Sequence, residues 1–132
     1  MTKAEEKWIK VATEALDKAY VPYSHFPVGA CLVTKAGKLY QGINIENASY
    51  GLSNCAERTA IFKAVSEGER EFKHLVVAGH TDNPISPCGA CRQVMAEFFE
   101  PDMPVTLIGD DGVTKETTVE GLLPYSFTEK DL

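Results

Sequence analysis

The chain has 132 residues, of which 44% are apolar and 24% charged, and these proportions predict one folded domain spanning residues 1–132 rather than a disordered chain. A formal net charge of −6 argues against long nucleic acid as a partner, because a protein that grips a phosphate backbone needs clustered Lys and Arg. The chain shows no apolar signal segment and no apolar run of membrane-spanning length. We therefore expect a cytoplasmic protein with no membrane partner, in which four cysteines indicate metal or redox chemistry before structural disulfides.

The hydrophobic pattern predicts alternating helices and strands. A capping-box pattern of Thr2 with Glu5 opens a helix that Pro22 ends, and short runs that are apolar throughout predict central strands covered on both faces. In chain order we expect a helix to about 20, strands 28–34 and 39–45, a helix over 55–67, a strand over 74–79, a helix from the second cysteine pair to about 100, strands 105–108 and 113–117, and a short helix over 119–123. This order implies an α/β fold with one mixed sheet between layers of helices.

Three features of the first half have a plain and a functional interpretation. Aromatic side chains in the loop 21–27, Phe26 among them, pack at the edge of a core more often than they line a pocket for a flat ligand. Alternation places Asn44 and Glu46 on one face at the end of a strand, which is usually a solvated edge but would suit sugar hydroxyls at the mouth of a site. Cys31, within an apolar strand, is expected to be an inert core thiol.

Cys88 and Cys91 form a C-x-x-C pair at the start of a predicted helix. Taken alone, the pair fits a thioredoxin-like redox site, a structural zinc half-site or a catalytic zinc half-site about equally well. The redox interpretation leaves Cys55 and Glu57 unexplained. A closed structural site lacks a fourth ligand, because Cys31 belongs to a strand and the three histidines show no ligand spacing. Three thiolates and one open position, the ligand set of a catalytic zinc, are the most economical interpretation.

A metal ligand followed two residues later by Glu, and then Pro-Cys-x-x-Cys, is the pattern of zinc deaminases, and the chain carries both halves in order. Zinc lowers the pKa of a water ligand from ~15.7 toward ~7, so Glu57 beside the metal can take a proton and deliver it to a ring nitrogen and to a departing amine. Two helix N-termini and a guanidinium from Arg58 would offset the negative charge of three thiolates. For Arg92 we expect an ordinary surface ion pair.

The segments Cys55–Ala60 and Pro87–Val94, with Tyr23–Ala30 and Asn44–Ala48, resemble the small-subunit, homotetrameric cytidine deaminases, and the likeness covers essentially the whole chain. The resemblance implies a single-domain, three-layer αβα sandwich with a mixed five-stranded sheet and one Zn²⁺ per subunit. It also implies hydrolytic deamination of cytidine and 2′-deoxycytidine to uridine and 2′-deoxyuridine with release of ammonia, in pyrimidine salvage.

The same resemblance assigns the residues that bind the nucleoside. Phe26 would stack on the pyrimidine, and Asn44 and Glu46 would bind the ribose hydroxyls. The resemblance further implies base contacts from the backbone of Ala56 and Ser86, and completion of a neighbouring subunit's site by Tyr50 and Phe127.

Several rival functions fit these residues less well. A deaminase of tRNA or DNA would need a basic surface, and a deoxycytidylate deaminase would need cations where Glu46 stands, because a carboxylate repels phosphate. A deaminase of blasticidin S shares the metal motif, but Phe26 and the pair Asn44 and Glu46 fit a nucleoside better. A non-catalytic, zinc-stabilised binding module stays the alternative from another class, and Glu57 is the feature against it.

Overall fold

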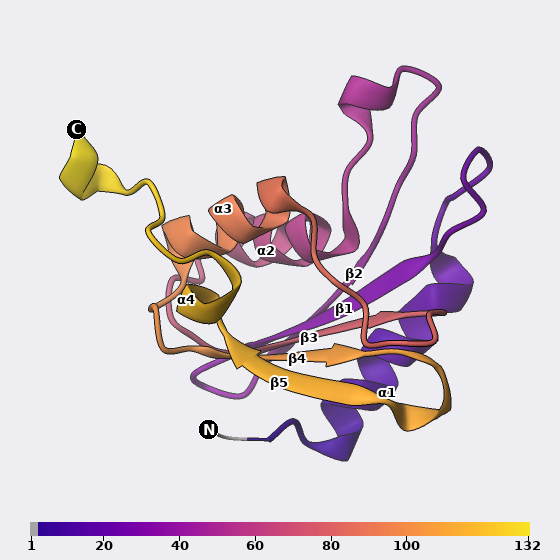
Figure 1. The fold of residues 1–132 in the computed structure, drawn as a ribbon, viewed down its shortest axis with the longest axis horizontal. Coiled ribbons are helices and arrows are strands. Elements are labelled where there is room, and N and C mark those ends of the chain that lie inside the picture. Colours follow the sequence, from indigo (N-terminus) through magenta and orange to yellow (C-terminus); the bar gives the residue numbers. More distant parts are fainter. Residues whose placement is uncertain (1–2) are drawn as a thin grey trace.

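The computed structural model describes residues 3–132 as three layers, with α1 on one face of a five-stranded sheet and α2 and α3 on the other (Figure 1). The strand order is β2-β1-β3-β4-β5; β3 and β4 are parallel and all other neighbours are antiparallel, so the predicted mixed sheet is confirmed. The elements are α1 (Glu6–Ala15), β1 (Val28–Thr34), β2 (Leu39–Ile43), α2 (Ala56–Ser66), β3 (Phe72–Gly79), α3 (Gly89–Phe98), β4 (Pro104–Ile108), β5 (Thr114–Thr118) and α4 (Val119–Leu122).

The central strand β3 is buried on both faces because each face carries its own apolar core. Leu75 and Val77 belong to the core beneath α2 and α3, whereas Val76 and Ala78 belong to the core beneath α1. Successive side chains of a strand point to opposite faces, so a strand covered on both sides reads as a continuous apolar run. The sequence signal of the central strand therefore reflects the three-layer architecture directly.

Helix α1 is shorter than the sequence predicts at both ends. It begins at Glu6, with Glu5 as an N-cap that makes no side-chain cap hydrogen bond, so a capping box with Glu5 inside the first turn is wrong; Thr2 lies outside the described residues. The helix ends at Ala15, followed by a 3₁₀ turn to residue 18. The backbone of Tyr20 cannot continue the helix because it pairs with the chain beyond β2, at the isolated bridge to residue 45. The other boundaries agree with the prediction within two residues.

The chain beyond β2 connects three segments. Strand β2 ends at Ile43, and Ile45 forms isolated bridges both to Tyr20 and to Asn54, the residue before the first cysteine of the motif. Gly42 lies against the first turn of α2, where a Cβ atom would overlap the carbonyl oxygen of Ala56. These close contacts fix the start of α2 over the edge of the sheet.

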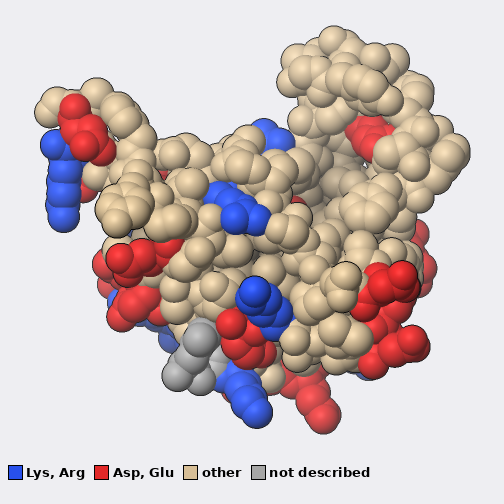
Figure 2. Space-filling model, viewed as in Figure 1, with Lys and Arg blue, Asp and Glu red and all other residues tan. Residues whose placement is uncertain are grey.

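The loop 21–27 and residues 46–54 project from the three layers at one end of the molecule, and the C-terminal segment after α4 projects at the other end (Figure 1). On the face shown in Figure 2, uncharged residues make up most of the surface at both ends, and acidic side chains gather on the body below them. Within residues 3–132, no helix combines the length and the apolar character that crossing a membrane requires.

Candidate metal centre and active site

The motif cysteines lie at the N-termini of two helices that share one face of the sheet. Cys55 is the N-cap residue of α2 and Cys88 is the N-cap residue of α3, and both have extended backbone angles. Cys91 follows in the first turn of α3, one helical turn from Cys88. Helix N-termini favour negative charge, so this placement stabilises thiolates at the point where the two helices meet.

The three sulfurs are close enough to share one metal ion. Cys55 Sγ lies 3.7 Å from Cys88 Sγ, which lies 3.3 Å from Cys91 Sγ, and all three sulfurs lie within 4.8 Å of one another. Zinc–sulfur bonds of about 2.3 Å in a tetrahedron require sulfurs about 3.8 Å apart. The three cysteines therefore fit one zinc ion with a fourth position left for another ligand. Cys31 is buried in the core beneath α1, where burial raises the pKa of its thiol to about 12, as expected for an inert thiol.

Interactions within the cluster shift the pKa values of two of the thiols in opposite directions. Interaction with the nearby Cys91 thiol, together with a hydrogen bond from Arg58 Nη2 over 3.1 Å, lowers the pKa of Cys55 to about 5. The same interaction with Cys55, added to burial, raises the pKa of Cys91. Zinc binding would release the protons that remain on the cluster, because the ligating form of cysteine is the thiolate.

Glu57 is the buried acid of the cluster. It is the second residue of α2, its exposed fraction is 4%, and it interacts with the sulfurs of Cys55 and Cys91. Burial raises the pKa of its carboxyl to about 7, and the negative charge at Cys55 acts in the same direction. A carboxyl that titrates near neutral pH both accepts and donates a proton readily, which is the property of a general acid–base group.

Asn44 holds the loop that carries Phe26. Its Oδ1 accepts a hydrogen bond of 2.9 Å from the backbone N–H of Val28, and its Nδ2 donates one of 2.9 Å to the carbonyl oxygen of Phe26. The sequence predicted Asn44 within the end of a strand over 39–45, whereas β2 ends at Ile43, and it gave no sign of these contacts because the partners lie 16 and 18 residues away.

Glu46 holds the same loop nearer its start. Its Oε1 accepts hydrogen bonds of 3.1 Å from the backbone N–H groups of Tyr23 and Ser24. Hydrogen bonds from Ser24 hold the pKa of the Glu46 carboxyl below its ordinary value. Asn44 and Glu46 together therefore fix the loop 21–28 against the chain beyond β2.

Residues 2–106 match the family model described as "Cytidine and deoxycytidylate deaminase zinc-binding region". The chain belongs to this deaminase family. A cytidine deaminase of Sporosarcina psychrophila is 56% identical over 127 residues, which cover 96% of this chain and 93% of that protein. The crystal structure of a cytidine deaminase from Burkholderia pseudomallei matches with a TM-score of 0.91 and 50% identity, over 95% of this chain and 100% of that one. A blasticidin-S deaminase of Bacillus cereus is 34% identical over 128 residues, covering 91% of this chain and 89% of that protein.

Several predicted site residues of this deaminase lie next to the metal-binding cysteines along the chain. Ala56 and Glu57 follow the first cysteine on α2, and Ser86 lies two residues before Cys88 on the loop that enters α3. Phe26 has an exposed fraction of 44% in the loop held by residues 44 and 46. The family and the fold class predicted from the sequence are confirmed.

Two predicted residues of the deaminase belong to the segments that project from the three layers. Tyr50 belongs to the projection 46–54 and has an exposed fraction of 73%, whereas Phe127, with 59%, belongs to the C-terminal segment. Figure 1 shows these two segments at opposite ends of the molecule. Within one chain, therefore, these two aromatic side chains do not enclose a common site.

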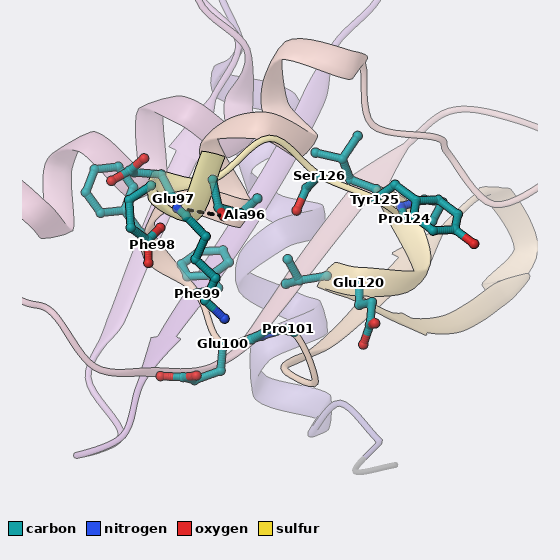
Figure 3. Close-up of a pocket in the computed structure, with 15 residues that line it drawn as sticks. Ala96, Glu97, Phe98, Phe99, Glu100, Pro101, Glu120, Pro124, Tyr125 and Ser126 are labelled. Carbon is teal, nitrogen blue, oxygen red and sulfur yellow. Dashed lines mark hydrogen bonds between the residues drawn. The ribbon is translucent and has the colours of Figure 1, made fainter. Parts of the chain in front are cut away.

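A hollow of about 780 Å³ lies at the base of the C-terminal segment (Figure 3). It is bounded by the end of α3, by α4 and by residues 124–130, with Phe99 and Tyr125 among its lining side chains. None of the three metal-binding cysteines lines this hollow or the smaller one beside β3.

Arg92 is the site residue that the sequence led us to misjudge. We expected an ordinary surface ion pair, but among residues 3–132 no carboxylate forms a salt bridge with it. Its guanidinium donates instead to two backbone carbonyl groups and one hydroxyl group. Such contacts join segments distant in sequence, and no local pattern announces them.

Proposed function

We propose that this deaminase hydrolyses cytidine and 2′-deoxycytidine to uridine and 2′-deoxyuridine with release of ammonia. The observation that carries the proposal is the convergence of three metal-binding sulfurs with a buried carboxyl, that of Glu57, whose pKa is about 7. The family match and the identity to a named cytidine deaminase support the substrate class. A redox pair or a purely structural zinc site gives this carboxyl no task.

Cys55, Cys88 and Cys91 would hold the zinc ion, which when bound supplies Lewis acidity toward a water molecule at the fourth position. Glu57 accepts a proton from that water and passes it to the ring nitrogen beside the carbon that bears the amino group. The water oxygen bonds to that carbon, and the same carboxyl then delivers the second proton of the water to the amine, so that the C–N bond breaks and ammonia leaves. Water and cytidine thereby become uridine and ammonia, and Glu57 returns to its starting protonation state.

The positive groups around the sulfurs offset their charge. Three thiolates and a divalent zinc ion leave one net negative charge, which weakens the metal as a Lewis acid. The N-termini of α2 and α3 and the guanidinium of Arg58, which donates to Cys55 Sγ, act against that charge. We therefore propose that Arg58 tunes the thiolate it contacts.

The loop held by Asn44 and Glu46 presents the nucleoside-binding groups. We propose that Phe26 stacks on the pyrimidine, while the two polar side chains bind the ribose hydroxyls. Asn44 uses one donor and one acceptor on the loop, so its amide keeps a further N–H group for a sugar. The loop hydrogen bonds of Glu46 use Oε1, so Oε2 is available for a hydroxyl. The backbone of Ala56 and Ser86 would contact the base.

Neighbouring subunits would close the site. We propose a homotetramer in which Tyr50 and Phe127 reach the site of an adjacent copy. Two features support this: the high exposure of both aromatic side chains and their position on projecting segments. Burying large apolar side chains against a partner stabilises an assembly. The place that we propose for the enzyme is the cytoplasm, and its proposed role is pyrimidine salvage.

A nucleoside panel tests the proposed activity. Zinc-loaded protein is incubated with cytidine, 2′-deoxycytidine, deoxycytidylate and blasticidin S, and ammonia release is measured with the matching loss of the substrate's ultraviolet spectrum. We expect turnover of both nucleosides and much slower reaction with the nucleotide, because Glu46 repels a 5′-phosphate. Faster reaction with blasticidin S than with cytidine would favour the second candidate, which the similarity to a blasticidin-S deaminase raises. If none of the four substrates reacts, the non-catalytic, zinc-stabilised binding module is the remaining candidate function.

A further inference from the structure

All three nitrogens of the Arg92 guanidinium are engaged with neutral oxygens. Nε donates to the carbonyl oxygen of Pro87 over 2.9 Å, Nη1 to that of Leu122 over 2.8 Å, and Nη2 to Ser86 Oγ over 2.6 Å. The side chain is half-buried, so these contacts are partly shielded from water. A planar guanidinium reaches three acceptors in fixed directions, which the single ammonium group of lysine does not.

The three acceptors of Arg92 belong to two segments that are far apart in the sequence. Ser86 and Pro87 immediately precede Cys88 on the loop that enters α3, whereas Leu122 is the last residue of α4, 30 residues beyond the arginine. The guanidinium follows Cys91 directly on α3. It therefore ties the loop before one metal ligand, the helix that carries another, and the start of the C-terminal segment into one unit.

The residue next to Arg92 extends the same connection. Gln93 Nε2 donates a hydrogen bond of 2.9 Å to the carbonyl oxygen of Phe127. Two successive side chains of α3 thus hold the C-terminal segment at two points, at Leu122 and at Phe127. The position of this segment and the shape of the loop at Ser86 are consequently set by the same turn of α3.

We propose that Arg92 is a positioning residue for the substrate base: it fixes the backbone at Ser86 and links that loop to the C-terminal segment that carries Phe127. The inference rests on the proposed function, because the base contact at Ser86 is part of it. Arg92 acts through the loop and touches neither substrate nor metal. Its loss should therefore weaken substrate binding while the three cysteines still hold zinc.

The test compares Arg92→Gln and Arg92→Lys with a matched control, Arg70→Gln. Arg70 likewise donates to two backbone carbonyls, those of Val65 and Glu69, but it is exposed and lies beyond the far end of α2. Zinc per subunit, thermal unfolding midpoint, kcat and KM for cytidine are measured for each variant.

We expect both Arg92 variants to retain one zinc per subunit and to raise KM about tenfold or more, because a small misplacement of a positioning group is costly. Lysine restores little, since it does not satisfy three fixed acceptors. Hydrogen exchange of the backbone at residues 124–128 should also become faster in the Arg92 variants. The Arg70 variant should keep the KM and the exchange rates of the wild type.

Ser86→Ala provides a second route that does not depend on how well the Arg92 variants fold. It removes one acceptor of the guanidinium and should raise KM in the same direction. In the double variant with Arg92→Gln the two effects should be less than additive, as for residues that act through one contact.

An unchanged KM in the Arg92 variants, a KM that rises only together with loss of zinc, or full additivity with Ser86→Ala would overturn the positioning role. If the Arg92 variants do not fold, an unchanged KM in Ser86→Ala overturns it. Wild-type turnover of cytidine tests the proposed function separately, because it does not depend on any variant.

Discussion

The guanidinium of Arg58 donates a hydrogen bond to Cys55 Sγ over 3.1 Å, from a position three residues further along the same helix. The contact places a permanent positive charge beside the Cys55 sulfur. This sulfur lies close to those of Cys88 and Cys91, at the N-termini of α2 and α3. A hydrogen bond to a ligating thiolate withdraws electron density from it and so strengthens the metal as a Lewis acid.

Replacement of this arginine should therefore impair turnover more than metal binding. We expect Arg58→Gln to retain zinc, because all three thiols remain, and to lower kcat by about 10–100-fold, the usual effect of removing a partner of a metal ligand. Lys63→Gln, which removes a cation two turns along α2, should leave kcat near the wild-type value. Equal kcat values for Arg58→Gln and Lys63→Gln would contradict the role.

The four cysteines separate into three that bind metal and one that does not. Cys88→Ala should lose zinc, measured by elemental analysis, because two sulfurs do not complete the ligand set. Cys31→Ala is the matched control, since this thiol is buried in the core on the other side of the sheet. Zinc retained in the first variant, or lost in the second, would show that the ligand set is wrong.

Asn44 is expected to affect both the sugar and the loop. Asn44→Ala frees the carbonyl of Phe26 and the N–H group of Val28, so it should raise KM for free cytosine as well as for cytidine. The rise should be larger for cytidine, because only the nucleoside loses a hydrogen bond to ribose. Steady-state kinetics with both substrates separate the two contributions. The same proportional increase for both substrates would leave Asn44 with the loop alone and refute the ribose contact.

A buried histidine connects the central strand to the edge of the sheet. His74 Nε2 lies 2.7 Å from Thr106 Oγ1, which donates its only proton to Glu116 Oε2 over 2.6 Å, so the ring must donate from Nε2. Nδ1 is buried without a hydrogen-bond partner among the described residues, and the ring lies 5.1 Å from that of Trp8. Burial lowers the pKa of His74, and the opposing charge of Glu116 does not reverse this.

This histidine predicts a loss of stability in mild acid. A group whose pKa is lower in the folded state contributes stability that is full above its ordinary pKa of about 6.5 and is lost as the pH falls through the folded value. His74 should therefore lower the free energy of unfolding, from denaturant titrations at fixed protein and zinc concentrations, as the pH falls from 7 to 5, against the opposite contribution of Glu57, whose pKa is raised. His74→Gln keeps a donor near the Nε2 position but does not titrate, so it should shift the slope of the free energy of unfolding against pH toward greater stability in acid. An unchanged slope would show that other groups cause it.

Local patterns were sufficient to predict the order of the elements and the metal ligands, because apolar periodicity and cysteine spacing are properties of neighbouring residues. The sequence did not predict where α1 ends, because Tyr20 pairs with the chain around Ile45, far along the sequence. The loop contacts of Asn44 and the carbonyl contacts of Arg92 were missed for the same reason. Each of these contacts depends on which backbone groups, distant in sequence, remain unpaired in the folded chain. Local sequence patterns do not predict those groups.

The account depends most on a zinc ion held by sulfur and on a proton carried by Glu57. The most direct measurement is ammonia release from cytidine by the wild type and by Glu57→Gln, with zinc per subunit determined on the same samples. We predict one zinc in both proteins, rapid release by the wild type and a rate lower by about 10²–10⁴-fold in the variant, the usual contribution of a general acid–base group. Near-normal turnover in zinc-loaded Glu57→Gln would contradict the central claim.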